Sequence, residues 1–329
     1  MRIAVLGGGA WGTALAQTQC LSGRETVLWA RSMATVNDIN ERHANETYLP
    51  GVKLALSLKA THSLAEALAG SDIVLVVTPA QATRVTLAAM RPLIGPSAQV
   101  LLCAKGLEQS SGLRLSTIAA EILPSHPVAV LSGPGFAAEV VRGLPTAVTL
   151  ASADATLGAE LAQRLGSQSF RIYWTADITG VEIGGAVKNV LAIAAGILDG
   201  RQLGASAHAA LVTRGFAELR RFAAAAGADP ATLMGLSGLG DLMLTCSSPM
   251  SRNMSLGRAL GQGRPLAEVL AGRRSVAEGV ATSVAVAREA RRQDIDMPIA
   301  MAVSAILAGT LHIDEAIAAL LSRPFKAED

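Results

Sequence analysis

The sequence begins MRIAVLGGGAWG, Met1 to Gly12, and this stretch decides the fold. Its apolar run, Ile3 to Leu6, has the length and branching of a buried strand, and a helix-like Ala-Leu-Ala segment follows the glycines. In the G-x-G-x-x-G between them, Gly7 allows a sharp turn, Gly9 has no Cβ to exclude a pyrophosphate, and Gly12 allows close packing of helix and strand. The helix N-terminus offers N–H groups to phosphates, so we predict a dinucleotide-binding turn rather than an ordinary tight turn.

Composition limits the class of protein. The 329 residues are enough for two domains, and half of them are hydrophobic but only 3% aromatic, so the cores must be aliphatic. A net charge of +2, without basic runs that alternate with aromatics, predicts no nucleic-acid partner. Three cysteines without a C-x-x-C predict neither a disulfide framework nor a zinc site, which suits the cytoplasm. Because Met1 directly precedes the first predicted strand, we expect no signal peptide, and the interrupted apolar stretches predict no membrane span.

Strand-like and helix-like segments alternate over the first half of the chain, which is typical of parallel strands with helices on both faces. Beyond Trp174 no further strand is expected, and Ala-rich helices continue to the end. We therefore predict an α/β fold, a Rossmann-type doubly wound, mainly parallel sheet in residues 1–178, followed by an all-α domain in residues 179–329. Further strands are expected at Thr26–Ala30, Ile73–Val77, Val100–Cys103, Val128–Leu131, Thr146–Ala151 and Phe170–Trp174, and helices at Met33–Glu41, Leu64–Ala69, Leu113–Leu123 and Ala155–Leu165.

The end of the second strand bears on the choice of cofactor. NAD-specific sites place an Asp or Glu there for the ribose 2′-hydroxyl, whereas this chain has Arg31. Glu25 lies at the wrong end of that strand, and Asp38 lies inside the next helix. An arginine can pair with a 2′-phosphate, so we favour NADP(H) over a surface role for Arg31, with NAD(H) left open.

A long apolar helix, expected at Val181–Gly200, opens the second half and carries Lys188. Its side chains are apolar almost all round, so it should be buried between neighbours. Gly184 and Gly185 lie one turn before the lysine, where its side chain leans, and we expect them to leave space for a ligand. A buried ammonium needs a partner, and an anionic substrate would serve. A lysine that reaches to the surface is the alternative.

A glycine-rich turn with Asp241 and a helix N-terminus at Ser251, Arg252 and Asn253 follow. Free N–H groups, a guanidinium and an amide there suit a phosphate. Taken singly, Asp241 could anchor its turn, Ser251 could be a plain N-cap and Arg252 a solvated charge. Their presence together with Lys188 favours a functional interpretation. The five histidines lack ligand-like spacing, so no metal is expected.

Together these motifs resemble the soluble NAD(P)-dependent glycerol-3-phosphate dehydrogenases of bacterial type over nearly the whole chain. The resemblance includes the glycine turn, several internal segments and the lysine helix. The motifs are GGGAWGTALA (7–16), YLPG (48–51), KGL (105–107), SGPGFA (132–137), VKNVLAIAAG (187–196), GLGDL (238–242), LTC (244–246), SRN (251–253) and VAEG (276–279).

The resemblance implies that NAD(P)H reduces dihydroxyacetone phosphate to sn-glycerol 3-phosphate, a precursor of glycerophospholipids, with Lys188 as catalytic acid/base. It implies substrate contacts at Lys105, Gly133, Gly135, Lys188, Asp241, Ser251, Arg252 and Asn253. The cofactor would be lined by Gly7, Gly9, Ala10, Trp11, Gly12, Arg31, Lys105, Ala137, Arg252, Val276 and Glu278. The chain departs from the family pattern at two positions, where Gly135 replaces the usual Ser and Ala104 the usual Thr, so Gly135 offers no side-chain contact.

Two rival interpretations stay open at this point. A β-hydroxyacid dehydrogenase-like enzyme would also join this nucleotide fold to a helical domain with a lysine helix. Those proteins usually place Asn one helical turn after the lysine, whereas here Asn189 follows Lys188 directly and Ala192 stands a turn later. A non-catalytic NADP-binding regulator is the second rival, and it would make no use of Lys188. The oligomeric state is also open, with a homodimer as one arrangement.

Overall fold

The computed structural model describes residues 1–272 and 276–324 of the chain. Eight strands form one sheet in the order β3-β2-β1-β4-β5-β6-β7-β8, which confirms the predicted α/β class. Every neighbouring pair is parallel except β6 and β7, which run antiparallel. The strands are β1 (Arg2–Leu6), β2 (Glu25–Trp29), β3 (Lys59–Thr61), β4 (Ile73–Val76), β5 (Gln99–Leu102), β6 (Val128–Ser132), β7 (Thr146–Ala151) and β8 (Phe170–Thr175).

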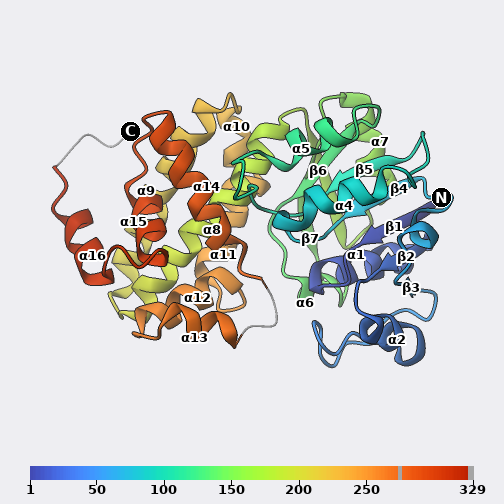
Figure 1. Ribbon diagram of the computed structural model, residues 1–329, viewed down its shortest axis with the longest axis horizontal. Helices are drawn as coiled ribbons and strands as arrows, with labels where there is room; N and C mark the ends of the chain where they lie inside the picture. Colours follow the sequence, from blue (N-terminus) through green and yellow to red (C-terminus); the bar gives the residue numbers. More distant parts are fainter. Residues whose placement is uncertain (273–275, 325–329) are drawn as a thin grey trace.

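Helices cover both faces of the sheet (Figure 1). Alternate strand residues enter different cores: Ile3 and Val5 of β1 pack with α1, α2 and α7, whereas Ala4 and Leu6 pack with α3, α4 and α5. Both faces are therefore apolar, as expected for a buried parallel sheet. The helices of this domain are α1 (Ala10–Leu21), α2 (Met33–Arg42), α3 (Leu64–Leu68), η1 (Ala80–Ala82), α4 (Thr83–Met90), α5 (Leu115–Ile122), α6 (Ala137–Val140) and α7 (Ala155–Leu165).

The sheet has two features that the sequence analysis did not specify. Strand β3 was not predicted, because a three-residue edge strand is too short to show an alternating pattern. Strand β7 runs antiparallel to β6, and the connection between them contains only the four-residue α6, which packs against α1 on one face of the sheet. The predicted strands agree with the observed ones to within one or two residues.

The second half is helical from Ile178 onward, and α8 (Ile178–Gly200) lies at its centre (Figure 1). Asp177 caps α8 by accepting from the N–H of Gly180, so the helix starts three residues before the predicted Val181. Within the described ranges α8 alone is long and apolar enough to cross a membrane, and its most apolar 18-residue window is wholly buried inside the molecule. Around it lie α9 (Gly204–Ala225), α10 (Pro230–Met234), η2 (Leu236–Gly240), α11 (Asp241–Ser247), α12 (Arg252–Gly261), α13 (Leu266–Ala271), α14 (Glu278–Arg292), α15 (Pro298–Leu307) and α16 (Ile313–Leu321).

Helices α8 and α12 touch backbone to backbone. A Cβ on Gly196 would lie 2.0 Å from the carbonyl oxygen of Met254, and a Cβ on Gly257 would lie 2.0 Å from the carbonyl oxygen of Ile193. Neither position accepts a side chain, because the obstacle is main chain that cannot rotate away. The two helices are therefore locked in one register. The predicted division after residue 178 falls at the first residue of α8 and stays a prediction.

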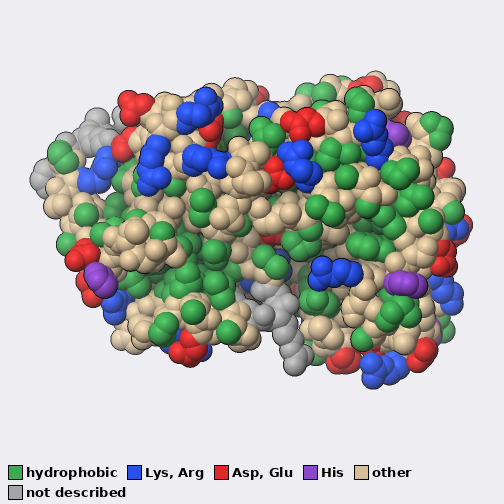
Figure 2. Space-filling model, viewed as in Figure 1, with side chains coloured by type: hydrophobic (Ala, Val, Ile, Leu, Met, Phe, Trp, Pro, Cys, Tyr) green, Lys and Arg blue, Asp and Glu red, His purple; other side chains and the backbone are tan. Residues whose placement is uncertain are grey.

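In the space-filling view, the outline narrows where the helical half meets the sheet half (Figure 2). Basic and acidic side chains are interspersed on the face shown, with apolar side chains between them (Figure 2). The site residues of both halves meet at this junction.

Candidate active site

The glycine turn has the geometry that its sequence predicts. Gly7 has φ +136°, and a Cβ there would lie 2.8 Å from the carbonyl oxygen of Val77. A Cβ on Gly12 would lie 1.9 Å from the carbonyl oxygen of Gly7, whereas a Cβ on Gly9 would meet nothing within 4 Å. Gly9 is also the N-cap of α1 and provides no side-chain cap. The turn is thus packed on its protein side and open at Gly9, which fits a pyrophosphate at the start of α1.

The other cofactor candidates lie around this turn. Arg31 is exposed and directly follows Ala30, whose Cβ lies 2.6 Å from the Cβ position of Gly8. Trp11, the second residue of α1, has a buried indole N–H without a hydrogen-bond partner among the described residues. Ala137 is the first residue of α6. The more distant Val276 is half exposed, just before α14.

Three charged side chains from three different segments meet beside Trp11. The Lys188 ammonium on α8 donates to Oδ1 of Asp241 at 2.6 Å, and the Lys105 ammonium donates to Oδ2 of the same carboxylate at 2.8 Å. Lys105 also donates to the carbonyl oxygen of Gly133 at 2.7 Å and lies 5.9 Å from the Trp11 ring centre. Asp241 is 1% exposed and Lys188 5% exposed, so four of the predicted substrate contacts, Lys105, Gly133, Lys188 and Asp241, form one cluster around a buried carboxylate.

Two expectations about Lys188 are wrong. Gly184 and Gly185 do not clear space for a ligand, because a Cβ on Gly184 would lie 2.6 Å from the carbonyl oxygen of Ser237 and one on Gly185 the same distance from Oγ of Ser132. These glycines let other segments pack against α8. Nor does the buried ammonium depend on a substrate for its partner, since the Asp241 carboxylate already compensates it.

The shared carboxylate sets the protonation of the cluster. Burial lowers the pKa of Lys188 to about 8, an effect that Asp241 opposes and the neighbouring Lys105 charge reinforces. Burial alone would raise the pKa of Asp241, but the two ammonium groups outweigh it and lower that pKa. Asp241 therefore stays ionised, while Lys188 can give up a proton near neutral pH, as a general acid requires.

Residues Ser251 to Asn253 form the predicted helix N-terminus. Ser251 is the N-cap of α12, and its hydroxyl accepts from the N–H of Met254 at 3.2 Å. Arg252 is exposed at the first helical position, whereas Asn253 is buried. The Asn253 amide donates to Oδ1 of Asn189 at 2.9 Å. A helix N-terminus with an exposed guanidinium is suited to a phosphate.

Glu278 links the two halves of the molecule at the start of α14. Its Oε1 accepts from the N–H of Ala80 in η1 at 3.1 Å. Burial raises the pKa of Glu278, and the Ala80 N–H and the charge of Arg252 oppose that shift. Glu278 and Arg252 therefore lie close enough for their charges to interact. Through Ala80, Glu278 also contacts the sheet domain.

The loop after β6 closes the site on the side of the sheet. Gly133 has φ +148°, and its Cβ position lies 2.8 Å from the Cα of Val148, so only glycine fits there. At Gly135 a Cβ would lie 3.1 Å from the methyl group of Thr146 and 3.6 Å from the Trp11 ring. A side chain at position 135 would thus point toward Trp11 and require Thr146 to give way.

Two polar residues of the cluster escaped the sequence reasoning. Thr245 accepts a hydrogen bond from the Lys188 ammonium at 2.6 Å, and its place four residues after Asp241 on one helix was the available signal. The Asn189 amide donates to the carbonyl oxygen of Lys105 at 3.0 Å. Its position next to Lys188 in the sequence could have indicated a supporting role.

No cluster of His, Cys, Asp and Glu suited to a metal occurs in the described ranges.

A dinucleotide-binding turn, a buried lysine poised to exchange a proton and a phosphate-suited helix N-terminus define a class: nicotinamide-dependent oxidoreductases that act on a small anionic substrate. Family models narrow this class. The model described as NAD-dependent glycerol-3-phosphate dehydrogenase N-terminus matches residues 2–158, and the C-terminus model of the same enzyme matches residues 177–318. The chain therefore belongs to the NAD-dependent glycerol-3-phosphate dehydrogenase family, rather than to either rival class.

Known proteins agree with this assignment over the full length. The chain is 56% identical to glycerol-3-phosphate dehydrogenase [NAD(P)+] of Parvibaculum lavamentivorans, over 99% of this chain and 98% of the relative. It is 54% identical to the Caulobacter vibrioides enzyme of the same name, with the same coverage. The crystal structure of glycerol-3-phosphate dehydrogenase from Coxiella burnetii superposes with a TM-score of 0.94 at 39% identity, covering 98% of this chain and 99% of that one.

Proposed function

We propose that Lys188 is the general acid with which this glycerol-3-phosphate dehydrogenase [NAD(P)+] reduces dihydroxyacetone phosphate to sn-glycerol 3-phosphate. Family membership supports the reaction, whose product is a backbone precursor of glycerophospholipids. The observation that carries the residue assignment is the buried Lys188 ammonium, 2.6 Å from the carboxylate of Asp241. The nicotinamide, when bound, supplies the hydride for the carbonyl carbon.

Lys188 and Lys105 have different tasks in this mechanism. As negative charge develops on the carbonyl oxygen, the Lys105 ammonium stabilises it, and the Lys188 ammonium donates the proton that converts the oxygen into a neutral hydroxyl. Asp241 holds both ammonium groups in place, since each of its oxygens accepts from one lysine. After the transfer Lys188 is neutral, and Asp241 keeps the charge of Lys105 as its counterion.

The substrate phosphate binds at the N-terminus of α12. Arg252 supplies the guanidinium there, and the first N–H groups of the helix supply further donors. Asn253 lies below Arg252 on the buried side, where its amide is engaged with Asn189 and orients the helix end. Gly133 contributes its carbonyl oxygen to the placement of Lys105, and its missing side chain leaves room for Val148 of β7. Gly135, the predicted substrate contact after it, offers only main chain.

The cofactor lies across the glycine turn, with the pyrophosphate at Gly9 and the start of α1. Arg31, at the end of β2, pairs with a 2′-phosphate, so NADP(H) is preferred over NAD(H). Lys105 is assigned to the nicotinamide side together with Trp11, whose ring centre lies 5.9 Å from its ammonium, and Glu278, which lies next to Gly106. The remaining cofactor contacts are Gly7, Ala10, Gly12, Ala137, Arg252 and Val276.

Lys188→Met tests the assignment, because it keeps the length of the side chain and removes only the ammonium. Asp241 keeps Lys105 as a partner at 2.8 Å, so the variant should fold with a Tm close to that of the wild type. We expect kcat/KM for dihydroxyacetone phosphate to fall by at least ~10³, since general-acid help is typically worth ~10²–10⁴ and the ammonium also attracts the anion.

The matched control is Lys53→Met, at an exposed lysine of the sheet domain, which should leave kcat/KM unchanged. NADPH binding, followed by fluorescence, should survive in both variants. A folded Lys188→Met protein that keeps more than about a tenth of the activity would transfer the acid role to Lys105.

We further infer a cytoplasmic location, supported by three free, buried cysteine thiols, Cys20, Cys103 and Cys246. Cell fractionation with an antibody against the chain tests this. A homodimer stays the alternative to a monomer, and light scattering on the purified protein decides between them.

A further inference from the structure

The loop that carries Lys105, residues 103–114, contains no helix or strand between β5 and α5. Its second half forms a turn of its own, in which the N–H of Glu108 donates to the carbonyl oxygen of Leu113 at 3.0 Å, and side chains from other elements attach the loop to the rest of the molecule. On the helical side, the Asn189 amide donates to the carbonyl oxygen of Lys105 at 3.0 Å. On the side of the sheet domain, the Gln81 amide donates to the carbonyl oxygen of Leu107 at 2.8 Å. The catalytic-site lysine is thus held from both halves of the molecule.

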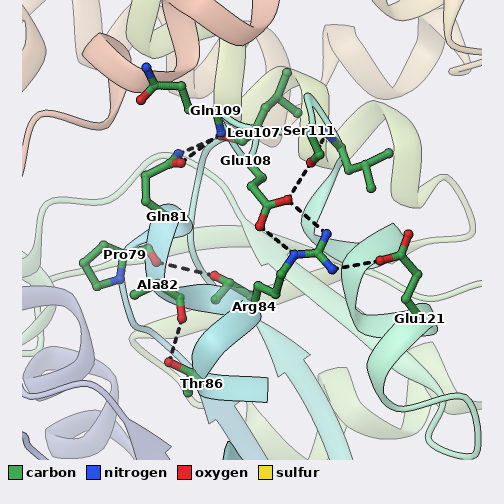
Figure 3. A network of polar contacts seen from close by, with 12 residues as sticks. Pro79, Gln81, Ala82, Arg84, Thr86, Leu107, Glu108, Gln109, Ser111 and Glu121 are labelled. Atoms are coloured by element: carbon green, nitrogen blue, oxygen red, sulfur yellow. Dashed lines mark hydrogen bonds and ion pairs between the residues drawn. The ribbon is translucent and has the colours of Figure 1, made fainter. Parts of the chain in front are cut away.

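Gln81 makes a two-point contact with the loop. Besides its bond to Leu107, its side-chain oxygen accepts from the N–H of Gln109 at 2.9 Å, so one amide pairs with two main-chain groups (Figure 3). The residue between them, Glu108, forms a two-point ion pair with Arg84, with Nε to Oε1 at 2.8 Å and Nη2 to Oε2 at 2.9 Å (Figure 3). Glu108 is 7% exposed, so this stretch of the loop is fixed as a unit.

The segment that provides Gln81 also contacts the cofactor side of the site. Gln81 is the middle residue of η1, and the first residue, Ala80, donates its N–H to Glu278 at 3.1 Å. Gly106, next to Lys105, packs against the same place, because its Cβ position lies 2.8 Å from the Cβ of Ala80 and 3.2 Å from Oε2 of Glu278. A shift of η1 would therefore be felt at Lys105 and at Glu278.

We propose that Gln81 is a positioning residue: by pairing with Leu107 and Gln109, it fixes where the Lys105 ammonium stands between Gly133 and Asp241. The proposal rests on the proposed function, in which Lys105 stabilises the developing charge. Gln81 itself is exposed on the surface of the sheet domain and touches neither lysine. Its effect is transmitted through the main chain of the loop.

A displaced Lys105 has a specific consequence for Lys188. The groups that face the Lys188 ammonium are Asp241 and Cys246 on α11 and Lys105 on the loop. If Lys105 moves away, Lys188 loses a neighbouring positive charge and no longer shares the Asp241 carboxylate. Both changes favour the ammonium form, so the pKa of Lys188 should rise. A purely structural role of Gln81 would not have this effect.

The test is Gln81→Met, which keeps the length of the side chain and removes both hydrogen bonds. The matched control is Asn40→Leu. The Asn40 amide makes the same kind of two-point contact with the main chain of Ala60, at 2.8 and 2.9 Å, in the edge strand β3. We expect kcat for dihydroxyacetone phosphate to fall about tenfold in Gln81→Met, because misplacement of a catalytic group is costly and Asn189 retains part of the loop.

The pH profile supplies the second readout. The alkaline limb of the kcat/KM profile should move up by about half a pH unit or more in Gln81→Met. Asn40→Leu should keep the wild-type kcat, and its kcat/KM should decline at the same alkaline pH as that of the wild type. Its loss of Tm should be similar to that of Gln81→Met. The inference would be overturned if Gln81→Met had the wild-type kcat and the wild-type alkaline limb. It would also be overturned if Asn40→Leu showed the same kinetic changes as Gln81→Met. If Lys188→Met stays active, it is the proposed function that fails; if Lys188→Met is inactive and Gln81→Met behaves as wild type, this inference alone fails.

Discussion

The side chains of Asn189 and Asn253 are hydrogen-bonded to each other, amide nitrogen of Asn253 to amide oxygen of Asn189, at 2.9 Å. Each continues the chain of contacts, since Asn189 donates to the carbonyl oxygen of Lys105 and Asn253 accepts from the N–H of Gly279. Four segments, the Lys105 loop, α8, α12 and α14, are therefore connected through two side chains. The proposed phosphate site cannot shift without disturbing the loop that carries Lys105.

The protonation of Lys188 predicts a pH dependence with a definite sign. Reduction of dihydroxyacetone phosphate requires the ammonium form, and burial lowers the pKa of Lys188 to about 8. The rate of reduction should therefore decline above about pH 8, whereas oxidation of glycerol 3-phosphate, which needs the neutral amine as base, should increase over the same range. Steady-state profiles of kcat/KM in both directions measure this. If kcat/KM changed in the same direction with rising pH for reduction and for oxidation, Lys188 would be excluded as the titrating group.

Arg252→Ala should weaken the binding of dihydroxyacetone phosphate by roughly 10–100-fold in KM, because a charge-assisted contact is worth about 1.5–3 kcal/mol. The residual reduction of unphosphorylated dihydroxyacetone should change far less, since that substrate has no phosphate to bind. Arg258→Ala, on the same helix and paired with Asp199 at 3.1 Å, is the control and should affect neither substrate. Equal losses for the two substrates in Arg252→Ala would mean that Arg252 acts on the cofactor or on the chemistry.

Arg31→Ala should raise the KM for NADPH and leave that for NADH nearly unchanged. The loss of a charge-assisted contact to the 2′-phosphate should cost about 1.5–3 kcal/mol at most. Because Arg31 is exposed, the variant should keep the wild-type Tm. The comparison of the two cofactors on one enzyme preparation contains its own control. Equal damage to both would show that Arg31 is an ordinary surface residue.

Gly257→Ala should destabilise the protein by about 3 kcal/mol or more, because the new Cβ would lie 2.0 Å from the carbonyl oxygen of Ile193. Gly158→Ala in α7 is the matched control: its Cβ would meet Ser152 at 3.4 Å, an ordinary contact, so stability should be equal or higher by up to about 1 kcal/mol. Thermal and urea unfolding compare the two. A Gly257→Ala protein as stable as Gly158→Ala would show that α8 and α12 can separate.

Features that depend on neighbours in the sequence were predictable. The glycine turn follows from the steric needs of Gly7 and Gly12, and the start of α12 follows from the hydroxyl of Ser251 as N-cap. Burial of α8 follows from its apolar circumference. In each case the cause lies within a few residues of the effect, so the sequence pattern records it.

Features that depend on distant segments were not predictable. Asp241 is 53 residues from Lys188 and 136 from Lys105, and no local pattern shows that it compensates both. The same reason applies to Gly184, whose missing side chain makes room for Ser237 rather than for a ligand. The edge strand β3 was missed because pairing with β2, not its three-residue sequence, makes it a strand.

The backbone contact between α8 and α12 fixes the relative position of the helix that carries the proposed acid and the helix that begins at the proposed phosphate site. Lys188 stands on one helix and Arg252 at the start of the other, and the register of the two helices is fixed at Gly196 and Gly257. In the proposed mode of binding, the distance between the main-chain N–H groups at the start of α12 and the main chain of Lys188 is therefore fixed. We therefore expect a phosphorylated ketone one carbon longer to be a poorer substrate, because a phosphate at the start of α12 would displace its carbonyl from the Lys188 ammonium.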